Sequence, residues 1–175
     1  MRDEKKHPWV KGGLTIEQGV LEQVFEEARA AYARDEESCG FLVGPEADAL
    51  SLTVDGIVPM VNQANKLHAR FPDRYPRTAR TYFDIDSMKF QTAIEQGAAN
   101  HRPVKILYHS HLDVGAYFSA TDADAAKMGG DEPPFDLAYL VTSVRDGKVD
   151  DHKLFVWDPA AKSFLESGLV VAGGT

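Results

Sequence analysis

Two histidines, a serine and an aspartate fall within one short stretch of the chain, Val104 to Asp122, which reads VKILYHSHLDVGAYFSATD. The first five residues are mostly β-branched, aliphatic or aromatic, which predicts a buried strand that carries His109 and His111 at its C-terminal end. Side chains two positions apart on a strand point the same way, so the two imidazoles can converge on one point. This pair is half of a candidate metal site.

The other half follows after a loop. Ser119-Ala-Thr-Asp122 has the S-x-x-D pattern of a helix N-terminus and leads into an Ala-rich segment that runs to Met128. The pattern places Asp122 in the first helical turn, where the helix dipole favours a carboxylate. Two neutral imidazoles and one carboxylate leave the fourth position of a tetrahedral zinc ion open for water, as in catalytic sites. Cys39 is the only cysteine, which excludes a structural zinc site built from thiolates.

A hydrolytic zinc site also needs a base that takes a proton from water and passes it to the leaving group. Three consecutive carboxylates, Asp35, Glu36 and Glu37, precede the apolar run 39–43, which predicts a second buried strand. A carboxylate at the mouth of that strand can lie beside the histidines. The residues alone do not distinguish among the three.

The complete pattern is His109-x-His111, seven residues, Ser119, two residues and Asp122, with Glu37-Ser38-Cys39-Gly40 far upstream. It resembles the JAMM (MPN-plus) metalloprotease family. The members of this family include deubiquitinating isopeptidases and bacterial enzymes that trim or release ubiquitin-like and sulfur-carrier proteins. The resemblance extends from the Glu37 strand to about Leu154, which is most of the chain.

The resemblance implies a Zn²⁺ site with three protein ligands, His109, His111 and Asp122. It also implies a general acid and base, Glu37, and a hydroxyl that stabilises the oxyanion, Ser119. The implied fold is an α/β, MPN-like (cytidine-deaminase-like) domain with a mixed, curved β-sheet packed between α-helices. The implied reaction is zinc-dependent hydrolysis of the peptide or isopeptide bond after the C-terminal Gly-Gly of a ubiquitin-like or sulfur-carrier protein. A ubiquitin-activating-type enzyme is a further implied partner.

Two other interpretations remain open. A serine hydrolase would use Ser119 or Ser110, but strand alternation turns Ser110 away from the histidines, and the chain has no G-x-S-x-G motif. A non-catalytic MPN or RadC-like module would bind zinc only to support an interaction, and the presence of Glu37 beside a full ligand set disfavours it. The chain departs from the family at Leu112, where many members have proline, so the following loop is expected to differ in shape.

Composition and charge are those of an ordinary globular domain. The chain has 175 residues, of which 43% are hydrophobic and 26% charged, and this length suits one domain. No apolar run approaches the roughly 20 residues of a membrane span, and the first residues lack a signal-peptide core. A net charge of -8 disfavours binding to nucleic acid, and a single cysteine is typical of the reducing cytoplasm.

The sequence predicts a flexible arm over 1–13, one domain over 14–168 and a flexible tail over 169–175. A capping box at Thr15–Gln18 opens an amphipathic helix that is expected to end at Ala33. Apolar patterns and turn residues predict further elements: a strand over 50–60 bent at Gly56, a strand over 81–85, a helix over 87–100 capped by Asp86, a hairpin of 135–144 with 153–157, and an edge strand over 163–171.

Residues 62–80 predict an irregular loop, because two prolines interrupt it and no apolar period extends through it. It is the one basic stretch of an acidic chain, with Lys66, Arg70, Arg74, Arg77 and Arg80. Two interpretations are equally supported, a solvated loop and a flap that covers a substrate tail or contacts its acidic surface. The final Gly-Gly-Thr resembles the tails that the family cleaves, but a frayed terminus is the favoured interpretation.

Overall fold

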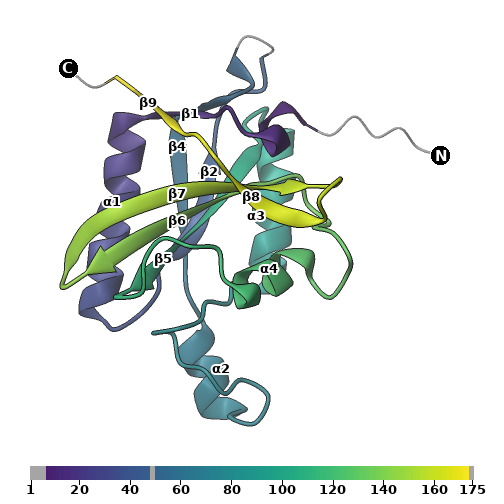
Figure 1. Ribbon diagram of the computed structural model, residues 1–175. Helices are drawn as coiled ribbons and strands as arrows, with labels where there is room; N and C mark the ends of the chain where they lie inside the picture. Colours follow the sequence, from purple (N-terminus) through teal and green to yellow (C-terminus); the bar gives the residue numbers. More distant parts are fainter. Residues whose placement is uncertain (1–6, 48–49, 174–175) are drawn as a thin grey trace.

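The computed structural model describes residues 7–47 and 50–173, and its centre is a six-stranded sheet (Figure 1). The strands are β2 (Cys39–Val43), β4 (Gly56–Met60), β5 (Val104–Leu112), β6 (Ala138–Arg145), β7 (Lys148–Asp158) and β8 (Ser163–Ser167). They lie in the order β4-β2-β5-β6-β7-β8. The β5–β6 pair is parallel and the other four pairs are antiparallel, so the sheet is mixed.

A second, smaller sheet lies at one end of the molecule. Its strands are β1 (Thr15–Glu17), β3 (Thr53–Val54) and β9 (Val170–Ala172), with β1 in the middle and parallel to both neighbours. The helices are α1 (Gln18–Ala33), α2 (Ala64–Arg70), α3 (Ser87–Ala99) and α4 (Ala120–Lys127), preceded by a 3-10 turn at Pro8–Lys11. Within the described part of the chain, none of them is both long and apolar enough to cross a bilayer.

Helices cover both faces of the large sheet. Ile106 and Tyr108 of β5 pack in the cluster that contains the apolar face of α1. Leu107 points to the opposite face, into the cluster that contains Phe90 of α3 and Ala126 of α4. This alternation follows from the pleat of the strand. The predicted α/β architecture, a mixed and curved sheet packed between helices, is confirmed (Figure 1).

The expected capping box at the start of α1 is absent. Thr15–Glu17 forms β1 instead, and Ile16 is completely buried between β3 and β9. The helix begins at Gln18, and the Glu17 side chain at its N-cap makes no capping hydrogen bond. Parallel pairing on both sides of β1 therefore outweighs the local capping preference.

Both predicted flexible ends are shorter than expected within the described residues. Trp9 is buried at 3% exposure, and its indole Nε1 donates a 2.7 Å hydrogen bond to the Asp136 carbonyl, so residues 7–13 pack on the domain. At the other end, Val170–Ala172 pairs with β1 as β9. The rest of the predicted arm, residues 1–6, and the last two residues of the tail lie outside the described residues.

The segment between β4 and α3 also differs from expectation. Residues 62–80 contain the short helix α2, and residues 81–85 form no strand. The backbone of this segment bonds to a side chain instead of a neighbouring strand. The Asn62 amide donates to the Tyr82 carbonyl, and the Asn62 oxygen accepts from the Asp84 N–H. These side-chain contacts join two distant segments, which local pattern cannot predict.

Several local predictions are confirmed. The β2 and β5 strands and their burial follow the apolar runs, and Asp86 caps α3 by accepting from the Met88 and Lys89 N–H groups. The β6–β7 hairpin turns at Asp146-Gly147, where both residues have positive φ, at 51° and 77°. That geometry is typical of a two-residue type I′ turn, for which Asp-Gly is a preferred sequence.

Lys105 is a completely buried cation that holds the region between β2 and β3. Its Nζ donates to the carbonyls of Pro45 and Thr53, both at 2.8 Å, and of Leu50 at 3.3 Å. It also lies 5.4 Å from the centre of the Trp9 ring. Burial lowers the pKa of this ammonium group to about 8, against an opposing contribution from the Asp55 carboxylate.

This pKa predicts a rise in stability with pH. Lys105 loses its proton near pH 8 in the folded chain but keeps it to 10.5 in the unfolded chain, so its contribution to the free energy of unfolding increases between these values. We expect a gain of up to about 3 kcal/mol, measured by denaturant unfolding at about pH 8 and about pH 10. Lys105→Met should be less stable throughout and should lose this gain. The same pH slope in the variant would show that another group is responsible.

Candidate metal centre

The two histidines of β5 converge as strand alternation predicts. His109 and His111 lie on the same face of the sheet as Leu107, and their Nε2 atoms are 3.2 Å apart. Both rings are buried, with 1% and 4% exposure. Two buried imidazole nitrogens at this distance can bind one metal ion together.

Asp122 completes a triangle of donor atoms. Its Oδ2 lies 3.2 Å from the Nε2 of His109 and 3.2 Å from the Nε2 of His111. Atoms bound at 2.0–2.1 Å to one tetrahedral zinc ion are about 3.3 Å apart. The equal sides of this triangle, and its chemistry of two imidazoles and one carboxylate, therefore fit a catalytic zinc site.

The start of α4 holds Asp122 in place. Ser119 and Asp122 form a reciprocal capping box, in which each side chain accepts a 3.0 Å hydrogen bond from the backbone N–H of the other. Burial acts to raise the pKa of the Asp122 carboxyl, but the facing histidines outweigh it and hold that pKa well below its usual range. The carboxylate is therefore ionised and already oriented.

Each imidazole has a different environment at its second nitrogen. His111 Nδ1 lies 2.9 Å from the Gly115 carbonyl, which can only accept, so Nδ1 carries a proton and Nε2 would present its lone pair to a bound metal ion. His109 Nδ1 is buried and has no hydrogen-bond partner among the described residues. Its ring stacks on Phe83 at a centroid distance of 4.6 Å. An aromatic stack and a carbonyl thus fix the two ring orientations.

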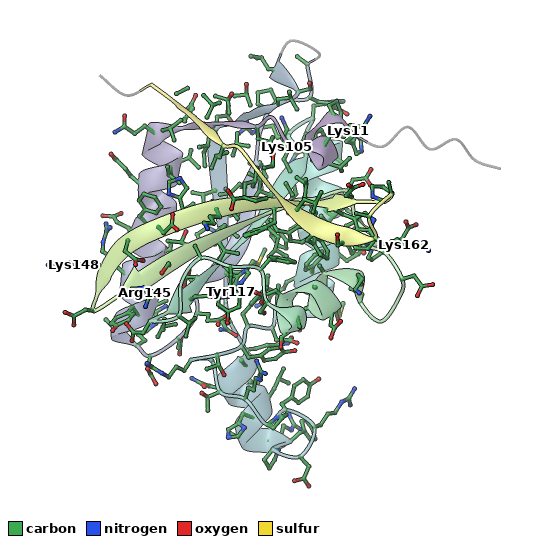
Figure 2. All side chains as sticks on the ribbon, in the orientation of Figure 1. Lys11, Lys105, Tyr117, Arg145, Lys148 and Lys162 are labelled. Carbon is green, nitrogen blue, oxygen red and sulfur yellow. The ribbon has the colours of Figure 1, made fainter. Side chains whose placement is uncertain are left out.

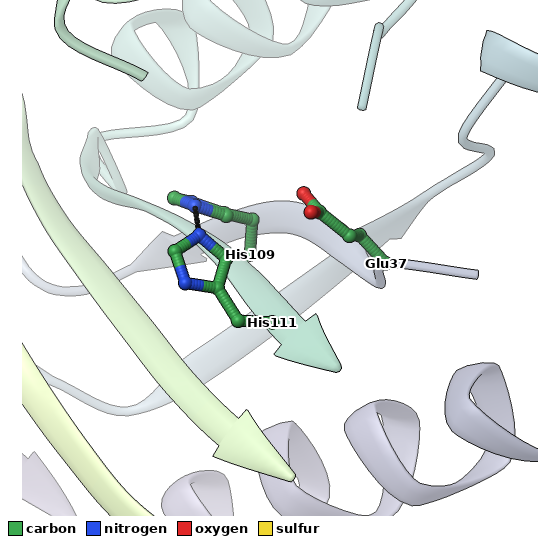
Figure 3. A group of neighbouring side chains, drawn as sticks. All are labelled: Glu37, His109 and His111. Atoms are coloured by element: carbon green, nitrogen blue, oxygen red, sulfur yellow. Dashed lines mark hydrogen bonds between the residues drawn. The ribbon is translucent and has the colours of Figure 1, made fainter. Parts of the chain in front are cut away.

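Glu37 lies in the segment between α1 and β2, and its carboxylate points toward the two histidines (Figure 3). One oxygen of its carboxylate and one nitrogen of each of His109 and His111 all lie within 4.8 Å of one another. The side chain is only 5% exposed. Burial and the nearby Asp122 charge raise the pKa of Glu37 well above its usual value, while Arg77 opposes them. A raised pKa makes it easier for this carboxyl group to take up a proton and give it back, which a general acid and base requires.

The structure separates the three consecutive carboxylates that sequence left equivalent. Asp35 is exposed and pairs with Arg80, and Glu36 contacts Arg34 at 3.5 Å. Only Glu37 of the three is buried at the metal centre. Its backbone is held on both sides, because its N–H donates to the Ala79 carbonyl at 2.7 Å and its carbonyl accepts from the Asn62 amide at 3.0 Å.

The nucleophile alternatives find no support in the described residues. Ser110 Oγ accepts hydrogen bonds from the N–H of Ser38 at 2.7 Å and from its hydroxyl at 2.9 Å, away from the histidines. The Ser119 hydroxyl caps α4, and no histidine within the described part of the chain is hydrogen-bonded to it. Burial raises the pKa of the Cys39 thiol to about 12, so it stays protonated. The Ser110–Ser38 contact instead ties the Glu37 segment to β5.

The loop after the histidines is tied down by Asp113. This residue has a φ of 62°, and its carboxylate accepts from the Tyr32 hydroxyl, from Arg80 and from the Asp146 N–H. Leu112 stays buried and in register with Val144. The loop returns Gly115 and Tyr117 to the His111 ring, with Tyr117 at a centroid distance of 5.0 Å. The loop is thus held without the usual proline.

A cavity of about 550 Å³ opens beside His109 and Asp122. It lies on the α3 and α4 side of the large sheet, and seven of its 20 lining residues are phenylalanine or tyrosine. The aromatic lining residues are Tyr75, Tyr82, Phe83, Phe90, Phe118, Phe135 and Tyr139. Sequence reasoning missed this wall, since its members come from five separate segments; only their frequency in 75–139 could have drawn attention to them.

A model of the family described as prokaryotic homologs of the JAB domain matches residues 17–157. The chain belongs to this family. This JAB homologue is 33% identical, over 133 residues, to proteins named CysO-cysteine peptidase from Mycobacterium bovis and Mycobacterium tuberculosis. The match covers 73% of this chain and 74% of each relative. The resemblance to the JAMM and MPN group is therefore confirmed.

Solved structures agree on the fold. A protein from Desulfitobacterium hafniense has a TM-score of 0.61 at 21% identity and covers 92% of this chain and 94% of its own. A protein from Salinibacter ruber has a TM-score of 0.59 at 26% identity, with 90% and 91% covered. A JAB1/MPN domain protein from Archaeoglobus fulgidus has a TM-score of 0.51 at 14% identity, with 92% and 99% covered. These likenesses concern architecture, which the JAB homologue shares.

Proposed function

We propose that the JAB homologue is a zinc-dependent peptidase that hydrolyses the bond after the C-terminal Gly-Gly of a sulfur-carrier or ubiquitin-like protein. The observation that carries the proposal is the triangle of three donor atoms at 3.2 Å with the buried Glu37 carboxylate beside it. The raised pKa of the Glu37 carboxyl suits a general acid and base beside the three donors. The similarity to proteins named CysO-cysteine peptidase supports a substrate in which a carrier protein has an amino acid attached to its C-terminus.

Each residue has a role in this proposal. His109, His111 and Asp122 would hold Zn²⁺, which when bound would lower the pKa of water to about 7 and polarise the scissile carbonyl. Glu37 accepts the proton of the attacking water and then delivers it to the leaving amine. Ser119 uses its hydroxyl oxygen to accept from the Asp122 N–H, so its own proton remains available to donate to the developing oxyanion.

The recessed position of the donors favours a glycine tail. His109, His111 and Asp122 are 1%, 4% and 8% exposed, so a substrate carbonyl must come into close contact with the chain around these donors. Glycine has no side chain to collide with the walls. The proposal includes a cytoplasmic pathway in which a ubiquitin-activating-type enzyme charges the carrier, and in which this peptidase releases the amino acid or peptide attached to it.

The test is cleavage of a sulfur-carrier protein extended by cysteine after its Gly-Gly, followed by mass spectrometry. We expect the zinc-loaded protein to release cysteine, EDTA to stop the reaction and zinc to restore it. A carrier whose final glycine is replaced by valine should be cleaved at least about tenfold more slowly. Cleavage that survives EDTA would point to a serine hydrolase. Stoichiometric zinc without cleavage of any Gly-Gly fusion would favour the zinc-binding interaction module.

A further inference from the structure

A basic projection leaves the domain beside the metal centre. It consists of residues 62–80 with α2 at its core, and it stands apart from the sheet and the other helices (Figure 1). It carries five of the 19 Lys and Arg residues but only one of the 27 acidic residues. The rest of the sequence has 14 Lys and Arg residues against 26 Asp and Glu residues, so the projection is opposite in charge to it.

Most of these charges are unpaired. Lys66, Arg70, Arg74 and Arg77 are all exposed, and none of them takes part in an ion pair between described residues. Arg80 differs, because it bridges Asp35 and Asp113 at the base of the projection. Four cations that make no ion pair between described residues remain available to a negatively charged partner.

The projection is an ordered surface. His68 Nδ1 lies 2.7 Å from the Tyr75 carbonyl, which closes the segment on itself. The guanidinium of Arg70 lies 5.5 Å from the Phe71 ring centre, and that of Arg74 lies 5.6 Å from the Tyr75 ring centre. Phe71 is 48% exposed beside these charges. Held cations around an exposed aromatic ring are typical of protein-binding surfaces.

The projection is joined directly to the proposed catalytic machinery. Its two ends bind the backbone of Glu37, through the Asn62 amide on one side and the Ala79 carbonyl on the other. Gln63 and Tyr75 also line the cavity that contains His109. A tail in this cavity would pass Gln63 and Tyr75, which brings the body of its protein within reach of the projection.

We propose that the basic projection docks an acidic face on the folded body of the carrier protein whose tail enters the metal centre. This inference rests on the proposed function, in which the carrier supplies the carbonyl side of the cleaved bond. The carrier fits better than the leaving group, because the leaving group in the relatives' name is a single cysteine, which cannot extend over a surface of this size. Opposite charges would orient the carrier before its tail is seated.

The test compares two double charge reversals in the zinc-loaded protein. Arg70→Glu with Arg74→Glu inverts the projection. Lys148→Glu with Lys162→Glu is the matched control, because both lysines are exposed and lie at strand ends away from α2 (Figure 2). The probes are an acidic sulfur-carrier protein extended by cysteine, and a short peptide with the same tail and no folded body.

We expect the projection variant to raise KM for the carrier at least about tenfold with kcat unchanged, and to cleave the peptide normally. The control variant should match the wild type. Raising NaCl from about 50 to about 300 mM should increase KM for the carrier in the wild type and much less in the projection variant. An unchanged KM for the carrier, or an equal defect on the peptide, would overturn the docking role.

The two proposals fail in different ways. If the wild type cleaves neither probe, the proposed reaction is wrong, and calorimetric titration of the carrier onto the zinc-loaded protein still tests the surface. Binding that weakens at least about tenfold in the projection variant supports the inference. Binding that is equal in both variants, or absent from both, refutes it. Tighter binding of a single-stranded oligonucleotide than of the carrier would also refute it.

Discussion

Glu37→Gln is expected to lower the rate of Gly-Gly cleavage by about 10²- to 10⁴-fold while the protein still binds one zinc ion. The amide cannot accept the proton of the attacking water, but it keeps the size of the side chain and leaves all three donor atoms in place. The measurements are steady-state cleavage and zinc content after dialysis. Glu36→Gln is the matched control, since it removes the neighbouring carboxylate, which contacts Arg34 rather than the histidines. Full cleavage by Glu37→Gln would remove Glu37 from the mechanism.

The same substitution should stabilise the metal-free protein at neutral pH. Because the folded-state pKa of Glu37 is raised, its contribution to stability is present below the unfolded value of 4.5 and is lost as pH rises through the folded value. At neutral pH the burial of this ionisable group destabilises the native state. Glutamine does not ionise, so the variant lacks this destabilisation. We expect Tm to rise by about 2 to 4 °C at neutral pH and little at about pH 4. A lower Tm at neutral pH would show that the carboxylate is already well compensated.

Asp122→Ala is expected to weaken zinc binding by at least about 100-fold and to abolish cleavage, because it removes one of three donor atoms. It also breaks the capping box with Ser119, which should lower the free energy of unfolding by about 1 kcal/mol. Competition with a chromogenic chelator measures the first effect, and denaturant unfolding of the metal-free protein measures the second.

Asp124→Ala provides the comparison for Asp122→Ala. It removes a carboxylate from the same helix, but that side chain is 82% exposed and reaches only Lys127, at 4.0 Å. Zinc affinity and cleavage should remain those of the wild type. If Asp122→Ala retained nanomolar zinc, the donor triangle would not describe the metal site.

The sequence was most informative where function depends on local geometry. His109 and His111 needed only strand alternation, and Ser119 with Asp122 needed only the spacing of a helical turn. The choice of Glu37 over Asp35 and Glu36 came from the family resemblance. In the structure Glu37 is the one of the three whose carboxylate lies within 4.8 Å of both histidine side chains, and two long-range hydrogen bonds hold its backbone.

The wrong and missing sequence predictions share one physical cause: interactions with residues far away in the chain outweigh local sequence preferences. Thr15–Glu17 has the letters of a capping box but becomes a strand because β3 and β9 flank it. Residues 81–85 have the composition of a strand, yet their polar groups bond to Asn62. The aromatic wall of the cavity and the Ser38–Ser110 contact also join segments far apart in the chain. Spacing within one segment carries no information about such pairs.

The parallel β5–β6 pair has a consequence for the order of assembly. Parallel neighbours require a crossover, and here the crossover is residues 113–137, which contains α4 and therefore Asp122. The two imidazoles belong to one strand and meet early, but the carboxylate reaches them only when this long connection closes, and closing it carries an entropic cost. If the proposed zinc site is correct, a chain in which this connection is still open has only two of the three donor groups together, so tight zinc binding would require the completed topology.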